Sequence, residues 1–163
     1  MQVTPSPDLT AFGSRLRRLL ERMDREVLAV YRAAGERFEP RWYAVFAALW
    51  DDGPLTVGEL SRRLGISHAA VSQIRRALEA EHLIRGAADP WDGRRQALSL
   101  TEAGRETAAR LAPLWAAIAA AVGDLLAEHA PTLPAGLDAL EQAVERRGLA
   151  ARIGRTLHQD IAQ

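Results

Sequence analysis

The sequence contains no cysteine, no lysine and no long apolar run, and each absence excludes something. Without cysteine, this chain of 163 residues has no disulfides, thiolate metal sites, cysteine nucleophiles or thiol redox sensors. Its four histidines share no i, i+3 or i, i+4 spacing, so we expect no metal site. Glycine-rich phosphate loops and paired-carboxylate motifs are also missing, which makes an enzyme a poor interpretation and leaves no cofactor to expect.

Signals for membrane insertion or export are missing as well. No stretch of 18 apolar residues occurs, and the N-terminus MQVTPSPDLT lacks a basic region followed by an apolar one. With 48% hydrophobic and 26% charged residues, the composition is that of a soluble globular protein with a core of its own. We therefore expect a cytoplasmic protein with no membrane partner.

The chain also lacks net charge, but its charges are unevenly distributed. All 21 basic residues are arginine, and 21 acidic residues balance them. Residues 61–95 hold seven arginines and four acids, a net charge of +3, so the remainder carries −3. Because the local field governs contact with phosphates more than the total charge does, neutrality does not exclude a nucleic-acid partner.

The spacing of apolar residues predicts helices on both sides of a central module. Thr101 is a good N-cap for a long helix, which Pro113 should kink because proline cannot donate to the carbonyl of Ala109. The other predicted flanking helices span 10–34, 39–51, 134–147 and 149–161. We expect a partner chain to cover their apolar stripes, the alternative being a larger core within one chain.

The segment 56–81 has the pattern of a helix-turn-helix. Thr56 and Glu59 form a capping box, Gly65 suits a left-handed turn, and Ser67 can cap the second helix. The apolar residues expected to hold the two helices together are Leu60, Leu64, Ile66, Val71, Ile74 and Leu78. A plain helical hairpin is the alternative interpretation.

Two short strands are predicted next, at 83–88 and 96–100, around the turn-forming segment DPWDGRR. They would add a wing to the helix-turn-helix. The expected fold is therefore mainly α with a small β-hairpin wing. N- and C-terminal dimerisation helices flank the winged helix-turn-helix core, in segments 10–50, 51–100 and 101–163.

The residues of this module resemble the multiple antibiotic resistance regulator (MarR) family of winged-helix repressors. The likeness runs over LTVGELSRRLGISHAAVSQIRRALEAEHLI and DPWDGRRQALSLTEAG, where the family usually shows D-P-x-D-R-R and then L-x-L-T-x-x-G. Gly93 replaces the usual first arginine of the wing. The residues that match are Asp89, Pro90, Asp92, Arg94, Leu98, Leu100, Thr101 and Gly104.

The resemblance implies an obligate homodimer that binds a pseudo-palindromic operator in double-stranded DNA. The outer face of the second helix would enter the major groove with Ser67, His68, Ala69, Ser72, Gln73 and Arg76. Arg62 and Arg75 would contact phosphates, and the wing would contribute Asp92, Arg94 and Arg95. The alternative function is a winged-helix module for protein interaction or dimerisation, with no operator.

The family also implies a small-molecule effector, captured between the two lobes, that shifts the affinity for DNA. Aromatic residues near Arg41 could line a pocket for an aromatic or weakly acidic ligand, although large aromatic residues at helical spacing also suit a simple core. The candidate ligand-binding residues are Arg41, Trp42, Tyr43, Phe46, Trp50 and Trp115.

Overall fold

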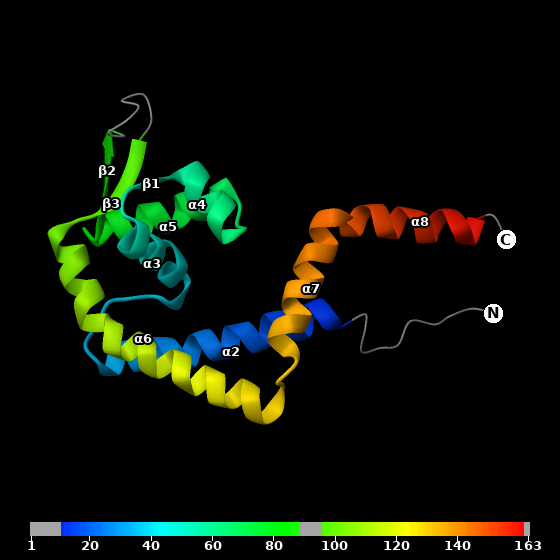
Figure 1. The fold of residues 1–163 in the computed structure, drawn as a ribbon, viewed down its shortest axis with the longest axis horizontal. Helices are drawn as coiled ribbons and strands as arrows, with labels where there is room; N and C mark the ends of the chain where they lie inside the picture. Colours follow the sequence, from blue (N-terminus) through cyan, green and yellow to red (C-terminus); the bar gives the residue numbers. More distant parts are fainter. Residues whose placement is uncertain (1–10, 89–95, 162–163) are drawn as a thin grey trace. The chain divides into compact units, whose positions relative to one another are not determined.

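The structure is a computed structural model that describes residues 11–88 and 96–161. Its contacts divide the chain into two units, the first ending at Leu114 and the second beginning at Trp115. Each unit is described by itself. The expected fold class is confirmed: the chain is mainly helical and carries one small antiparallel sheet, in the arrangement of a winged helix (Figure 1).

The first unit contains every strand and most of the helices. In chain order its elements are α2 (Phe12–Ala33), the 3-10 helix η1 (Pro40–Trp42), α3 (Tyr43–Asp52), β1 (Leu55–Thr56), α4 (Val57–Leu64), α5 (His68–Ala80), β2 (Ile84–Ala88), β3 (Gln96–Leu100) and the beginning of α6 (Glu102–His129). These bounds agree with the sequence predictions to within a few residues, except that β1 was not predicted.

The sheet has the order β1-β3-β2, and both pairings are antiparallel. Strands β2 and β3 pair from Ile84 with Leu100 to Ala88 with Gln96. The two residues of β1 pair with the middle of β3, Leu55 lying opposite Leu98. This third strand ties the beginning of α4 to the sheet, so the helix-turn-helix and the wing base share one hydrogen-bonded framework.

Apolar side chains of α4, α5 and β3 form the core of the module. Leu60 of α4, Val71 and Leu78 of α5 and Leu98 of β3 are fully buried. Their positions follow the predicted inner stripe, because residues three and four apart lie on one face of a helix. Burial of side chains of this size stabilises a fold by about 1.5–3 kcal/mol each.

A cluster of aromatic rings joins α2 to η1 and α3. Phe38 lies at its centre and meets Tyr31, Trp42 and Phe46 in edge-to-face contacts, with ring centroids 5.3, 5.6 and 5.3 Å away. All four rings are buried. Such pairs prefer an edge-to-face arrangement because the positive ring edge meets the negative face of its neighbour. The cluster fixes the end of α2 against the winged-helix module.

Helix α5 ends in a left-handed residue that is not glycine. His82 has a φ of 57°. The amide of Leu83 donates to the carbonyl of Leu78 at 2.9 Å, and the amide of His82 donates to that of Glu79 at 3.0 Å. This pair of bonds is a Schellman motif, which satisfies the last carbonyls of a helix.

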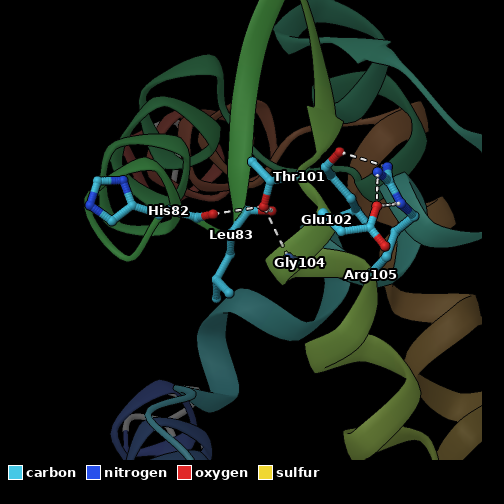
Figure 2. Close-up of polar contacts among 7 residues, drawn as sticks. His82, Leu83, Thr101, Glu102, Gly104 and Arg105 are labelled. Carbon is cyan, nitrogen blue, oxygen red and sulfur yellow. Dashed lines mark hydrogen bonds and ion pairs between the residues drawn. The ribbon is translucent and has the colours of Figure 1, made fainter.

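Thr101 joins the end of α5 to the beginning of α6 (Figure 2). Its hydroxyl donates to the carbonyls of His82, at 2.7 Å, and Leu83, at 3.2 Å. The same hydroxyl accepts from the amide of Gly104 at 3.0 Å. The amide of Thr101 also donates to the carbonyl of Leu83, at 3.0 Å. The predicted N-cap is therefore confirmed.

Gly104 allows this close approach. A Cβ atom built there would lie 2.1 Å from the carbonyl oxygen of Leu83, a distance that real Cβ atoms do not reach. The side chain of Arg105 closes the other side of the junction by donating to the carbonyl of Leu100 at 3.1 Å. Only glycine fits at position 104 without a movement of the backbone.

The second unit consists of the rest of α6, α7 (Leu133–Arg146) and α8 (Leu149–Ile161). Both terminal helices carry large apolar side chains that remain exposed: Leu133, Leu137, Leu140, Val144, Leu149, Ile153 and Leu157. Pro113 lies inside α6, directly before the boundary between the units. The kink expected at Pro113 stays a prediction.

Candidate nucleic-acid interface

Caps at both helix starts position the outer face of α5. The amide of Thr56 donates to the carboxylate of Glu59 at 2.7 Å, and the amide of Glu59 donates to the hydroxyl of Thr56 at 3.2 Å. Gly65 ends α4 with a φ of 65°. Ser67 then caps α5 by accepting from the amide of Ala70 at 3.2 Å. The predicted capping box, glycine turn and serine cap are all confirmed.

A serine side chain of α4 also fixes the turn. Ser61 donates from its hydroxyl to the carbonyl of Ile66 at 2.6 Å. The bond spans the turn between the two helices and satisfies a carbonyl within it. The angle between α4 and α5 therefore rests on a direct hydrogen bond as well as on apolar packing.

The residues proposed for the major groove share the outer surface of the module. Ser67, His68, Ala69, Gln73 and Arg76 are exposed, and Ser72 is half-buried. Short side chains occupy the beginning of α5 and longer polar ones its middle. This order would let the first turn approach base edges while Gln73 and Arg76 extend outward.

The arginines near this face differ in their availability. The guanidinium of Arg75 is bonded to Glu79 at 2.9 Å and is less than a third exposed. Arg63 pairs with Asp52. The guanidinium of Arg62 lies 3.4 Å from the carbonyl of Gly58, a long contact at an exposed site. Arg76 is exposed and has no partner within 11–88 and 96–161, so its charge is available to a ligand.

The proposed wing contacts Asp92, Arg94 and Arg95 lie outside the described residues. What the structure does show is the base of the wing. Ala88 and Gln96 are the last paired residues of β2 and β3, so the segment 89–95 connects the ends of an antiparallel pair. The antiparallel pairing of β2 with β3 is the one that the sequence predicted.

The residues proposed for a ligand pocket divide between two hollows. Trp42 is only 5% exposed and lines a hollow of about 300 Å³ between α2, η1 and the end of α5. Trp50 is 43% exposed and lines another, of about 410 Å³, beside Pro54, Arg85 and Ser99.

The other four candidates have different surroundings. Phe46 is fully buried in the aromatic cluster, and Tyr43 is exposed. Arg41 is bonded to Glu39 at 2.5 Å. Trp115 is half-buried and belongs to the second unit. Phe46 and the buried Trp42 therefore have the core role that was the alternative for the aromatic stripe, while Trp50 is exposed in its hollow.

Sequence reasoning missed two arginines and a glutamate that line the hollow of Trp42. Arg32 ends α2, Arg37 belongs to the loop after it, and Glu81 follows α5. No periodic pattern brings these three together, because they come from segments about 45 residues apart in the chain. Only the packing of η1 against both α2 and α5 places them around one hollow.

Glu36, which also lines the hollow, forms an ion pair with α6. Glu36 accepts from the guanidinium of Arg110 on α6 at 2.9 Å. The hydrogen bond and the negative charge of Glu36 raise the pKa of Arg110 above its ordinary value. Since an arginine is charged at all working pH values in any case, the pair acts as a fixed link between the α2–η1 loop and α6.

Comparison with known proteins points to one family. A model of the MarR family matches residues 38–95, the segment from Phe38 through η1, the helix-turn-helix and β2 to the residue before β3. No curated protein matches the sequence.

Solved structures share the fold over most of the chain. A probable transcriptional regulator from Pseudomonas aeruginosa is 28% identical, with a TM-score of 0.52, over 77% of this chain and 93% of that one. The PcaV regulator of Streptomyces coelicolor, solved with its natural ligand, is 23% identical with a TM-score of 0.63, over 89% and 99%. MepR of S. aureus, solved with DNA, is 19% identical with a TM-score of 0.66, over 81% and 97%. The winged-helix module of this chain is thus similar to the MarR family, by the family model over residues 38–95.

Proposed function

We propose that the protein is a DNA-binding transcriptional regulator, a repressor that binds a pseudo-palindromic operator as a homodimer in the cytoplasm. The observation that carries the proposal is the outer face of α5. That helix is fixed at its start by Ser67 and at its end by the Schellman motif, yet it leaves Gln73 and Arg76 exposed. The match of residues 38–95 to the MarR family model and the DNA complex of MepR support the same function.

The chemistry of the exposed face assigns a role to each side chain. Gln73 can pair with the N6 and N7 atoms of adenine, and Arg76 with the O6 and N7 atoms of guanine or with a phosphate. Ser67, His68, Ala69 and Ser72 would line the groove at the beginning of α5. Arg62 and Arg75 would contact phosphates, although Arg75 must then share its charge with Glu79. Asp92, Arg94 and Arg95 are the proposed DNA contacts of the wing.

The exposed apolar surface supports the homodimer. An 18-residue window of α6 has a mean hydropathy of 1.5 and is only 6% buried. Helices α2, α7 and α8 likewise expose leucines at helical spacing. Monomeric proteins rarely leave so many large apolar side chains in water, so a second copy is the proposed cover. A bilayer could also cover α6 by its length and composition alone, and the dimer experiment below distinguishes the two.

We also propose that a small aromatic or weakly acidic ligand modulates the affinity for DNA. The hollow lined by Trp42 supports this part of the proposal, and so does the ligand complex of PcaV. A ligand between α2 and the end of α5 would contact both a proposed dimerisation helix and the proposed reading helix.

Selection of bound duplexes from a random pool, at about 50 mM and about 200 mM salt, tests the function. Recovery of a palindromic motif at either salt concentration supports the operator-binding regulator. If no motif emerges even at the lower concentration, the protein-interaction module replaces it. In the selected duplex, Arg94→Ala should weaken binding and lower the salt slope by about one, since one phosphate contact is lost.

A further inference from the structure

Helix α6 packs against the rest of the chain only in its first three turns. Its buried residues are Gly104, Thr107, Ala108 and Leu111, and none follows them in the rest of this fully described helix. The side chains from residue 112 to residue 129 are exposed or half-buried. Packing within the chain therefore fixes α6 only before Pro113.

Hydrogen bonds reinforce the same part of the helix. Arg105 donates to the carbonyl of Leu100 at 3.1 Å, next to the cap formed by the preceding threonine. Arg110 donates to Glu36 of the loop after α2 at 2.9 Å and to the hydroxyl of Thr107 at 3.1 Å. These contacts tie the beginning of α6 to β3 and to the α2–η1 loop. The winged-helix module and the first three turns of α6 therefore form one body.

Pro113 comes directly after this body. It lies two residues beyond the last buried side chain of α6 and one residue before the end of the first unit. Because proline has no N–H to donate to the carbonyl of Ala109, the helix lacks one of its hydrogen bonds there. The exposed neighbours within about one turn are Ala109, Ala112, Ala116 and Ala117, whose side chains are too short to brace a bend. The missing bond thus coincides with the boundary between the two units.

We propose that Pro113 is a hinge that determines which spacings between operator half-sites the dimer accepts. The winged-helix module moves about it together with the first three turns of α6, while the helices of the second unit hold the two copies together. A hinge needs only a few residues that absorb the change in backbone direction. The role in spacing rests on the proposed DNA binding and homodimer, whereas the bending of α6 does not.

The geometry of DNA sets how far each hinge has to bend. One base pair inserted between two half-sites separates them by about 3.4 Å and turns them by about 34° relative to each other. Shared between two copies, this change requires a reorientation of about 17° at each hinge, which is within the range of kinks that proline produces in helices. Five inserted base pairs turn the second half-site to the opposite side of the duplex, by about half a turn. We therefore expect tolerance of one inserted base pair but not of five.

Distances between spin labels test the hinge in the full chain without DNA. The chain has no cysteine, so Gln73→Cys and Asp124→Cys, both at exposed positions, place one label on each side of Pro113. Dilution with unlabelled protein leaves only the distances within one chain. Pro113→Ala should narrow the distance distribution about twofold, because alanine restores the bond to the carbonyl of Ala109. The control pair Gln73→Cys and Glu106→Cys lies within one body, so its distribution should be narrow with either residue at position 113.

Duplexes of altered spacing test the role in DNA binding. The selected duplex is compared with duplexes that have one base pair removed, one added or five added at the centre of the motif. The wild type should lose affinity severalfold for a change of one base pair, and Pro113→Ala should lose about tenfold more, so that its range of accepted spacings is narrower wherever its centre lies. Pro134→Ala is the matched control, since Pro134 lies in the first turn of α7, where proline removes no helical bond. It should leave the range unchanged.

Each outcome separates the hinge from the proposed function. Melting curves show that the variants are folded, and Pro113→Ala should raise the thermal midpoint because alanine suits the interior of a helix better. If the distance distribution is equally wide with proline and with alanine, there is no hinge at Pro113. If it narrows but the range of spacings does not, α6 bends there and the role in spacing is wrong. If no duplex is selected at all, the proposed function fails, while the spin labels still decide the hinge.

Discussion

At the scale of single residues, Gly104 has the sharpest requirement in the structure. The variant Gly104→Ala places a methyl group 2.1 Å from the carbonyl oxygen of Leu83, so backbone must move. We expect it to lower the free energy of unfolding by about 2–3 kcal/mol, the upper range for overpacking a tight site. Urea denaturation measures the change.

Gly58→Ala is the matched control for this substitution. Gly58 also lies in a helix, but its added Cβ would meet its nearest neighbour, the ring of His68, at an ordinary 3.7 Å. There alanine should raise stability by up to about 1 kcal/mol because it loses less entropy on folding. Equal effects at the two positions would contradict the close approach.

A substitution at His82 is expected to raise stability, in contrast to Gly104→Ala. Its left-handed backbone is unfavourable for a residue with a Cβ atom, by roughly 1–2 kcal/mol. His82→Gly should therefore raise the thermal midpoint, because glycine is the usual residue at this position of a Schellman motif. Ala80→Gly, two residues earlier inside α5, should lower it. A loss of stability at position 82 would show that the imidazole has a structural role of its own.

Single residues also show where sequence reasoning succeeds and where it fails. Thr56, Ser67 and Thr101 were identified as caps because a cap needs only a local pattern of two or three residues. The sequence suggested that Trp42 and Trp50 line one pocket, but in the structure they line two different hollows. Residues eight apart on an α-helix differ by about 80° in direction, and Trp42 lies in η1, before the α-helix begins. One ring is therefore buried and the other exposed.

At the scale of secondary-structure elements, α4 depends on its cap. Thr56→Ala removes the hydroxyl that accepts from the amide of Glu59. We expect a loss of about 0.5–2 kcal/mol in the free energy of unfolding, the usual effect of losing an N-cap. Thr132 occupies the same position before α7 without a side-chain hydrogen bond. Thr132→Ala should be close to neutral, and chemical denaturation of both variants makes the comparison.

The proposed role of α5 in DNA binding gives a prediction. Arg76→Ala should weaken binding to the selected duplex, by about 1–3 kcal/mol if the arginine reads a guanine, and relax specificity at one base pair. Fluorescence anisotropy at several salt concentrations separates this outcome from a phosphate contact, which weakens all sequences alike. Arg25→Ala on α2 is the control. Unchanged affinity for Arg76→Ala would remove this face from the proposed interface.

The elements that were predicted have a pattern within their own residues. The element that was missed depends on a partner far away in the sequence. Helices α7 and α8 follow from an apolar residue every three or four positions, and β3 from its apolar residues between turn signals. Strand β1 consists of two residues between Pro54 and the first turn of α4, too few for any period. It exists because β3 offers it a free edge, a partner about 40 residues away in the chain. Such pairing is tertiary information.

At the scale of the whole molecule, the exposed leucines predict assembly. The double substitution Leu137→Glu/Leu140→Glu on α7 should convert a dimer to a monomer, because charge on an apolar interface is left without a partner. Light scattering after size exclusion measures the mass. Gln142→Glu, an exposed polar residue of the same helix, should leave the dimer intact. A wild-type chain that is monomeric in buffer but partitions into vesicles would overturn the dimer.

More of the fold than of the candidate ligand site could be predicted from the sequence. Caps, periodicity and turn residues act over a few positions, and together they indicated the winged helix and its flanking helices. The hollow at Trp42 depends on the meeting of α2, η1 and α5, which no local pattern reports. For that reason Arg32 and Glu81 were passed over while Arg76, on a readable helix face, was identified.

The junction at Thr101 also sets the order in which the protein can open. The amides of Thr101 and Gly104 and the hydroxyl between them join the end of the reading helix, the base of the wing and the start of α6 through bonds of 3.2 Å or less. None of these three elements can separate from the others without breaking these hydrogen bonds. In hydrogen–deuterium exchange, these two amides should therefore be released only with global unfolding, long after the ends of α2 and α8.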